Sequence, residues 1–364
     1  MPEFTDLNGV YNHINAYLND TNNAKISIIF ASNTSGKTRL SRQFCDAEES
    51  SVLCYNAFFE DCFSWDNESF ILKILENSWI NKLIKAEGID KEIDDNFKRF
   101  TSGRIESNIN DAVTEVTFKL LGDDENKENI KISKGEESLF IWSVFYTILG
   151  IAIDNLIESI DNRTTNYFDN LKNIVIDDPV SSMDDKRIIS VGLAITELLD
   201  KIVKNQDKLN PKLGILITTH HALFFSVIHN KSNKSEKRKQ QDYVLSREGK
   251  TYVLEEQNTS SPFAYHHEML LEIKKAIRTN SIKRYHFNLF RCLLEKTANF
   301  LGYGNRWSEL ARSKDSKELF AKMLNQYSHN QLSETEARFI EGDDKELFIN
   351  TFETFLKDYK WKYS

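Results

Sequence analysis

The sequence contains little proline, glycine or cysteine. Its 364 residues include 4 Pro, 13 Gly and 4 Cys, which excludes a collagen-like or low-complexity chain. The N-terminal stretch MPEFTDLNGVYNHINAY lacks the basic start and apolar core of a secretory signal, and we expect no apolar stretch long enough to span a membrane. Because 40% of the residues are apolar and 24 are Phe, the chain can bury one or two cores. We expect a globular, cytoplasmic protein without a membrane partner.

The four cysteines follow neither a metal-binding nor a disulfide pattern. Cys45, Cys54, Cys62 and Cys292 form no C-x-x-C pair and are too sparse for a disulfide framework. We therefore expect buried, reduced thiols.

The net charge of −8 argues against a chain that binds nucleic acid over its whole surface. Residues 272–296 depart from this average, with seven basic and two acidic side chains. Such a run is ordinarily a solvated face, and it permits a polyanionic partner without requiring one. The basic residues are Lys274, Lys275, Arg278, Lys283, Arg284, Arg291 and Lys296.

Residues 25–38 have the layout of a phosphate-binding loop. KISIIF at 25–30 predicts a buried strand, and the residues from Thr38 onward predict a helix, with a polar loop between them. The pattern G-x-x-x-x-G-K-[ST] keeps Gly36, Lys37 and Thr38, but Ala31 replaces its first glycine. Taken alone, the match fits a polar turn with a chance GKT equally well.

A strand–helix–strand unit further along the chain strengthens the interpretation as a nucleotide site. NIVIDDP at 173–179 and LGILITTH at 213–220 predict buried strands on either side of a helix. The first strand ends in Asp177, which is placed to hold Mg²⁺, and Asp178, which is placed to activate the attacking water.

The order of these motifs resembles that in ABC-type ATPases. DDPVSSMD at 177–184 looks like their Walker B motif and D-loop, ISKGE at 132–136 like their LSGGQ signature, and Thr219-His220 like their switch histidine. The resemblance implies that two heads close head-to-tail around two nucleotides. The γ-phosphate held by one head would then meet the signature residues Ser133, Gly135 and Glu136 of the other.

We expect ATP or GTP, with Mg²⁺, in this site. Lys37 is expected to contact the β- and γ-phosphates, Thr38 and Asp177 to hold Mg²⁺, and Asp178 and His220 to serve hydrolysis. The backbone amides that cradle the phosphates are those of Asn33, Thr34, Ser35 and Gly36. Because Ala31 and Thr34 stand where glycine gives the loop its freedom, binding without rapid hydrolysis is an alternative.

Other segments complete the local predictions. Residues 68–100 predict a helix, since their apolar positions recur with a period near 3.6, whereas residues 112–121 alternate as a strand does. Residues 231–241 predict a loop, and YVLSREGKTYVLEE at 243–256 predicts a hairpin.

The composition changes at residues 257–262, QNTSSP, which read as a linker or sharp turn. Beyond them only helices are expected. We therefore predict an α/β fold: a P-loop ATPase head of the ABC type at residues 1–262 and an all-helical domain at 263–364.

The helix predicted at residues 284–303 carries Arg291 and Glu295 on one face, four residues apart. An i,i+4 ion pair, with His329 as an ordinary surface histidine, is the simplest interpretation. The same three groups also suffice for RNA cleavage without a metal. That reaction needs a group that takes the 2′-OH proton, a group that protonates the leaving 5′-oxygen, and a cation for the phosphorane.

Nearly the whole chain resembles the PrrC-type bacterial anticodon nucleases. The resemblance implies an ABC-like head that controls a C-terminal ribonuclease domain, which cleaves a tRNA anticodon stem-loop to 2′,3′-cyclic phosphate and 5′-OH ends. It assigns the catalysis to Arg291, Glu295 and His329. The stretches that carry it are YNAFFEDCFSWDN at 55–67, SKGEESLFIWSVFYTIL at 133–149, NIVIDDPVSSMDD at 173–185, ITTHHALFF at 217–225 and RYHFNLFRCLLEKTANFLGY at 284–303.

The resemblance also implies a latent anti-phage effector that forms a homodimer or a higher oligomer and is silenced by a type I restriction-modification complex. The segment QNTSSPFAYHHEM at 257–269 does not match the members that cleave lysine tRNA, so the tRNA stays open. Two alternatives also stay open. One is a regulatory or DNA-repair ABC-type ATPase without nuclease activity, and the other is an oligomerisation module that has lost hydrolysis.

Overall fold

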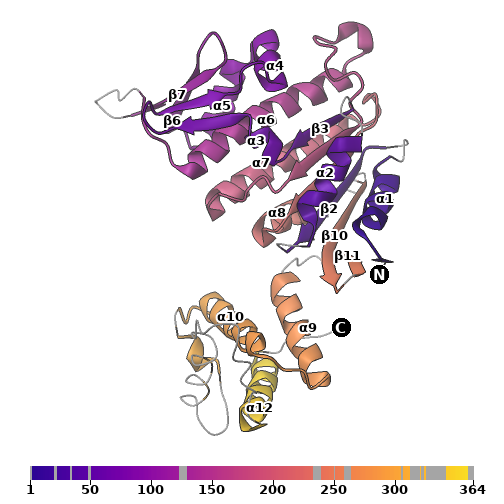
Figure 1. The fold of residues 1–364 in the computed structure, drawn as a ribbon, viewed down its shortest axis with the longest axis vertical. Helices are drawn as coiled ribbons and strands as arrows, with labels where there is room; N and C mark the ends of the chain where they lie inside the picture. The colour runs from indigo at the N-terminus through magenta and orange to yellow at the C-terminus, as the bar shows by residue number, and fades with distance from the viewer. Residues whose placement is uncertain are drawn as a thin grey trace. The chain divides into compact units, whose positions relative to one another are not determined.

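The computed structural model describes most of the chain as two compact units, Met1–Pro262 and Phe263–Ser364. Figure 1 shows the elements of both units. The described residues are 2–19, 23–32, 35–47, 51–122, 129–232, 239–249, 251–257, 264–304, 306–311, 320, 324 and 342–359. Asn33, Thr34 and His329, most of the expected linker at 257–262 and part of the expected loop at 231–241 lie outside them.

A seven-stranded sheet forms the centre of the first unit, in the order β1-β11-β10-β2-β9-β8-β3. The five strands from β10 to β3 are parallel, and β11 and β1 add an antiparallel edge. Both faces of β2 and β9 are buried, which explains why their sequences are continuous apolar runs. The bounds are β1 Glu3–Phe4, β2 Lys25–Ala31, β3 Val52–Tyr55, β8 Asn173–Asp177, β9 Gly214–Thr219, β10 Lys239–Glu248 and β11 Thr251–Glu256.

Helices cover both faces of this sheet (Figure 1). On one face, α1 (Leu7–Leu18) and α2 (Lys37–Ala47) pack on strand residues such as Ile29 and Leu216. On the other, Phe225 of α8 (Ala222–Ser232) meets Phe30 of β2, with ring centroids 5.9 Å apart. α7 (Asp185–Lys204) lies against α8, where Gly192 allows the close approach of Val227. Because the strands are parallel, β2, β8 and β9 end at the same edge of the sheet.

A second sheet shows where the helix prediction for residues 68–100 is wrong. Its strands pair antiparallel in the order β4-β5-β7-β6, and β5 contains the residues Ile71, Leu72 and Ile74. Pairing with β4 and β7 overrides the helical period there, whereas residues from Trp79 onward are helical. The bounds are β4 Phe63–Asp66, β5 Ile71–Ile74, β6 Ile105–Ile109, β7 Glu115–Leu120, α3 Ala57–Glu60, α4 Trp79–Glu87 and α5 Asp90–Phe100.

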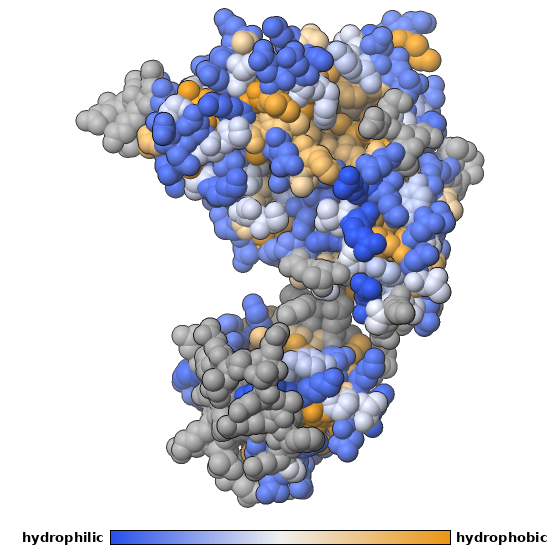
Figure 2. Space-filling model, in the orientation of Figure 1, coloured by the Kyte–Doolittle hydropathy of each residue, from blue (hydrophilic) through white to orange (hydrophobic). Residues whose placement is uncertain are grey.

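The surface of the first unit carries some large apolar side chains, among them Phe58, Leu75 and Trp79. In Figure 2 the first unit shows one larger apolar area among mostly hydrophilic residues.

Helix α6 (Lys134–Ile157) corrects the expectation that no apolar stretch is long enough to span a membrane. Its 24 residues are long and apolar enough by length and composition, but 78% of its most apolar window is buried inside the unit. Phe140, Trp142 and Phe145 are fully buried. The helix is apolar because other elements of the unit surround it.

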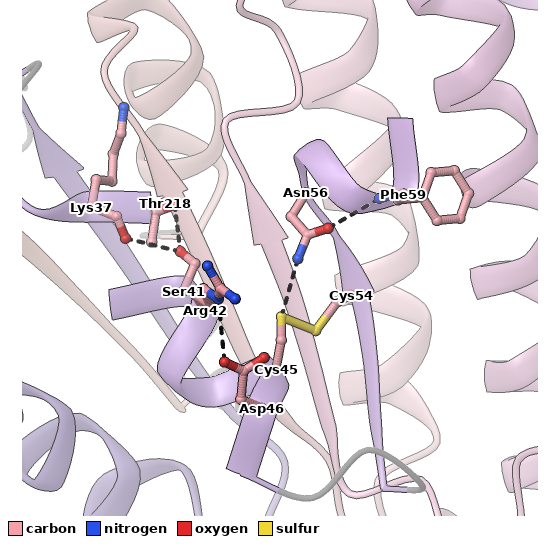
Figure 3. The surroundings of a disulfide bond; sticks show 9 residues. All are labelled: Lys37, Ser41, Arg42, Cys45, Asp46, Cys54, Asn56, Phe59 and Thr218. Atoms are coloured by element: carbon pink, nitrogen blue, oxygen red, sulfur yellow. Dashed lines mark hydrogen bonds and ion pairs between the residues drawn. A yellow bond between two sulfur atoms is a disulfide. The ribbon is translucent and has the colours of Figure 1, made fainter. Parts of the chain in front are cut away.

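Two cysteines expected to be reduced form a disulfide instead. Cys45 near the end of α2 and Cys54 on β3 have Cα atoms 6.1 Å apart, within bridging range. The side-chain amide of Asn56 donates to Cys45 Sγ at 3.6 Å (Figure 3). Of the two free thiols, Cys62 is partly buried and Cys292 is exposed, so the expectation of burial also fails for Cys292.

The second unit is helical throughout its described residues, with α9 Ala264–Arg278, α10 Arg284–Phe300, the 3-10 turn η2 Trp307–Glu309 and α12 Gly342–Asp358. Its core is aromatic. Phe290 of α10 lies in the middle, with its ring 5.1 to 5.6 Å from the rings of Phe320, Phe348, Phe352 and Phe355. Truncating such a buried ring to Ala typically costs about 3–5 kcal/mol of unfolding free energy. The described helices therefore share one core, and α10 is fixed within it.

Candidate functional site

The loop between β2 and α2 has the local geometry of a phosphate loop at its described end. Gly36 adopts a φ of 96°, which L-residues rarely tolerate, and α2 begins at the next residue, Lys37. The Ser35 hydroxyl donates to the Ser32 carbonyl at 2.6 Å and closes the turn. Ser35 and Lys37 are buried.

Lys37 reaches across to the strand that ends in two carboxylates. Its ammonium group donates to Asp178 Oδ2 at 3.0 Å. The other partner of this oxygen is Nδ1 of His220, which follows β9. The structure therefore brings together three residues that the sequence assigned to nucleotide binding and hydrolysis, from three separate segments of the chain.

Asp178 is held in a strained and strongly paired position. Its φ of 52° is left-handed, and its N–H donates to the Thr218 carbonyl at 2.8 Å. Burial alone would raise the pKa of Asp178, but Lys37 and His220 outweigh the burial and lower it. Asp178 is therefore an ionised carboxylate in an ion pair with Lys37.

Asp177 has the opposite environment. Its carboxylate accepts from the Thr218 hydroxyl and is hydrogen bonded to Thr38. Burial raises the pKa of Asp177, and these hydrogen bonds and the charge of Lys37 only partly oppose it. A buried carboxylate with this preference would gain from a bound cation.

The oxygen atoms of Thr38 and Asp177 are the ligands that Mg²⁺ prefers. No group of three or more His, Cys, Asp or Glu side chains that could hold a metal occurs among the described residues. Mg²⁺ would therefore take its remaining ligands here from phosphate and water, as is usual at nucleotide sites.

The signature residues stand at the first turn of α6. Ser133 caps the helix, and its N–H and hydroxyl donate to Glu136 Oε2 at 2.7 and 2.8 Å. Glu136 Oε1 accepts from Arg187 at 3.3 Å. Among the described residues, no hydrogen bond or ion pair joins Ser133 or Glu136 to Lys37 or Asp178. Arg187 could not be found from the sequence, because a contact across 51 positions leaves no local pattern.

In the second unit, Arg291 and Glu295 form the ion pair that their spacing predicts, with 2.8 Å between Nε and Oε1. The guanidinium also lies over the ring of Trp307, 5.2 Å from its centroid. Trp307 was not among the residues predicted from the sequence, although a Trp soon after the helix, in YGNRWSE, was a visible signal. His329, the third expected residue, lies outside the described residues.

The basic residues around Arg291 lie on α9, on α10 and at Lys283, the N-cap of α10. Lys275, Arg278, Lys283 and Lys296 are exposed, and the other basic residues of the run are partly buried. Glu272, one of its two acids, accepts from the Tyr285 hydroxyl at 2.6 Å and so belongs to a contact between the helices.

Known proteins show where this chain belongs. A curated anticodon nuclease from Escherichia coli is 39% identical over 342 residues, covering 85% of this chain and 83% of the relative. The chain belongs to the anticodon nuclease family. The part left uncovered is smaller than the second unit, so the alignment with the anticodon nuclease includes part of both units.

A family model described as an AAA domain also matches residues 72–357. The phosphate loop precedes that range, and its geometry supports the same P-loop class independently. The predicted α/β fold of a P-loop ATPase head is therefore confirmed, and heads of this class take a nucleotide with Mg²⁺.

Solved heads of SMC proteins resemble parts of this chain only distantly. The SMC head domain from Thermotoga maritima gives a TM-score of 0.34 at 8% identity, covering 65% of this chain and 91% of that one. A Smc head with an extended coiled coil, from Pyrococcus furiosus, gives 0.29 at 13% identity, covering 56% and 41%. At these TM-scores the likeness adds nothing to the fold assignment.

Proposed function

We propose that this protein is a nucleotide-gated endoribonuclease that cuts a tRNA within its anticodon loop. The observation that carries the proposal is the identity with an anticodon nuclease across most of the chain, together with the Arg291–Glu295 pair on α10. The products are a 2′,3′-cyclic phosphate and a 5′-hydroxyl, and no metal takes part in cutting the RNA.

The chemistry assigns one group to each need of the reaction. A base, Glu295 or His329, takes the proton of the ribose 2′-OH, whose oxygen attacks the neighbouring phosphorus. Whichever of Glu295 and His329 is not the base protonates the 5′-oxygen as the bond from that oxygen to phosphorus breaks. Arg291 places its guanidinium against the phosphorane oxygens, where negative charge increases in the transition state.

Contacts of Arg291 support its role. Glu295 and the Trp307 ring hold the guanidinium, so that less freedom is lost when it binds a phosphate. The exposed basic residues Lys275, Arg278, Lys283 and Lys296 would attract the RNA backbone.

The head acts as the gate in this proposal. With ATP or GTP and Mg²⁺ bound, Lys37 would leave Asp178 and contact the phosphates instead. Lys37 lowers the pKa of Asp178. When Lys37 leaves, the pKa of Asp178 rises, and Asp178 becomes a better acceptor for the proton of the attacking water. Thr38 and Asp177 would hold Mg²⁺, the amides of residues 33–36 would cradle the phosphates, and His220 would stay paired with Asp178. Two heads close head-to-tail on two nucleotides, in a homodimer or a higher oligomer.

The proposal includes the biology that the family resemblance implies. The nuclease is a latent anti-phage effector in the cytoplasm, silenced by a type I restriction-modification complex. Release during infection would stop translation by cutting one tRNA species.

Sequencing the 5′-hydroxyl ends of tRNA from cells that express the full chain tests the activity. We expect the ends to cluster in one anticodon loop and to vanish in cells that express Arg291→Ala. Arg306→Ala is the matched control, because it removes an arginine of the same unit from an exposed ion pair with Glu309 and should leave the cuts in place. The proposal would be refuted if tRNA stayed uncut in cells that express the wild-type chain in ample amount and contain no silencing partner.

A further inference from the structure

Arg187, in the first turn of α7, joins two motifs of the same head, the D-loop that precedes α7 and the signature turn at the start of α6. Its backbone N–H donates to Asp184 Oδ1 at 3.1 Å, and its Nε pairs with Asp184 Oδ2 at 3.3 Å. Its Nη2 reaches α6 and donates to Glu136 Oε1 at 3.3 Å. One side chain therefore ties the segment after β8 to the signature turn of the same protomer.

Gly135 leaves the space that this arrangement needs. A Cβ atom at residue 135 would lie 2.6 Å from Arg187 Nη1 and 3.3 Å from the Ser182 carbonyl oxygen. The guanidinium therefore packs directly on the backbone of the signature turn, and a larger residue at 135 would displace it. This requirement arises inside one protomer and is separate from any approach of a phosphate.

The contact between Arg187 and Glu136 changes the net charge at the N-terminus of α6. The first turn of α6 carries Glu136 and Glu137, and both charges oppose an anion at the helix N-terminus. Lys134 pairs with Glu137 at 2.7 Å, and Arg187 pairs with Glu136. The side chains of Arg187 and Glu136 are 25% and 23% exposed, so water and salt screen this pair less than a surface pair.

We propose that Arg187 is a positioning residue for the nucleotide-bound dimer, which neutralises Glu136 and holds the signature turn and the D-loop as one unit against the partner's triphosphate. The inference rests on the head-to-tail closure proposed above. It assigns Arg187 no contact with the nucleotide of its own head.

The test compares two binding steps in the full-length protein. Affinity for Mg²⁺ with a slowly hydrolysed ATP or GTP analogue is measured at low protein concentration, and dimer formation with the same analogue is measured by analytical ultracentrifugation. We expect Arg187→Ala to change nucleotide affinity less than about twofold. It should weaken dimer formation about tenfold or more, as loss of a hydrogen bond to a charged group predicts. Arg99→Ala, which breaks the exposed pair of Arg99 with Glu197 between α5 and α7, should affect neither.

A second substitution separates neutralisation from general damage to the fold. Gln can replace Glu at the third position of a capped helix, so Glu136→Gln keeps the cap while it removes the charge. If Arg187 acts by neutralising Glu136, adding Glu136→Gln to Arg187→Ala should restore most of the dimerisation. The defect of Arg187→Ala should also shrink as salt increases.

Three outcomes overturn the inference in distinguishable ways. Wild-type protein that never dimerises with nucleotide refutes the proposed closure and the inference together. A wild-type dimer that Arg187→Ala leaves intact refutes the inference alone. A defect that Glu136→Gln does not relieve at all refutes the electrostatic role.

Discussion

The two candidate sites each contain a cation paired with a carboxylate at nearly the same distance, yet the pairs are built differently. Lys37 and Asp178 are 3.0 Å apart, their side chains are 8% and 18% exposed, and 141 positions separate them. Arg291 and Glu295 are 2.8 Å apart, 19% and 41% exposed, and belong to one helix face. Only the first pair depends on the tertiary fold for its existence.

This difference separates stability from activity. Breaking a buried long-range pair leaves a buried charge behind, so its substitution affects folding and function together. Breaking a local pair near the surface costs little folding free energy. Loss of activity at Arg291 or Glu295 would therefore report on chemistry directly.

The largest effect is expected at the helical unit. Arg291→Lys and Glu295→Gln should each lower the rate of tRNA cleavage about 10²-fold or more, because a forked cation or a proton-transfer group is lost. The free energy of unfolding should change by less than about 1 kcal/mol. Single-turnover cleavage and urea unfolding check both numbers. If these variants lost as much unfolding free energy as the Lys37 variant, their slower cleavage could reflect unfolding, and the contrast between the two sites would disappear.

The next effect is expected at Lys37. Lys37→Ala should weaken binding of Mg²⁺–nucleotide about tenfold or more, because the ammonium contacts the β- and γ-phosphates in the proposed complex. It should also destabilise the ligand-free head by about 1–3 kcal/mol, since Asp178 loses its main cation. Calorimetric titration and thermal unfolding measure the two effects. Nucleotide affinity equal to that of the wild type would contradict the assignment of the loop.

Neighbouring carboxylates in the head should respond with opposite signs. The pKa of Asp178 is lowered in the folded protein, so its ionised form stabilises the fold above about pH 4, and this contribution is lost as the pH falls through its folded pKa. The pKa of Asp177 is raised, so ionisation above the unfolded value of about 4 opposes folding.

Asp178→Asn should therefore destabilise the ligand-free protein at pH 7 by about 1–3 kcal/mol. Asp177→Asn should stabilise it by about 0.5–2 kcal/mol and abolish stabilisation by Mg²⁺–nucleotide. Unfolding curves with and without nucleotide decide the matter. Shifts of the same sign for both variants would show that the two environments are alike.

The smallest effect is expected at Trp307. Trp307→Leu removes the ring beneath the Arg291 guanidinium and should slow tRNA cleavage about three- to thirtyfold. Trp307→Phe keeps an aromatic face and should recover part of the rate. Equal rates for all three proteins would show that Glu295 alone suffices to hold Arg291.

Part of this fold was predictable because its signals are local. Strands β8 and β9 are apolar runs that end in polar residues, and β10 and β11 pair as the hairpin predicted at 243–256. The Arg291–Glu295 contact follows from helical spacing alone.

The rest depends on partners distant in the sequence. β5 is a strand because β4 and β7 pair with it, although its residues fit a helical period. Cys45 and Cys54 meet because α2 returns beside β3, and Arg187 in the first turn of α7 reaches Glu136 in the first turn of α6. No local pattern encodes such contacts. The motifs could therefore be located from the sequence, but the long-range contacts that position them could not.

The most direct measurement combines the two sites in one assay of purified protein. Cleavage of labelled tRNA is followed with and without Mg²⁺–nucleotide for the wild type, Lys37→Ala and Arg291→Ala, alongside nucleotide binding by each. The account predicts that Arg291→Ala binds nucleotide as the wild type does and cuts no tRNA, whereas Lys37→Ala shows no response of cleavage to nucleotide. Arg291→Ala that cuts the anticodon loop at the wild-type rate would contradict it.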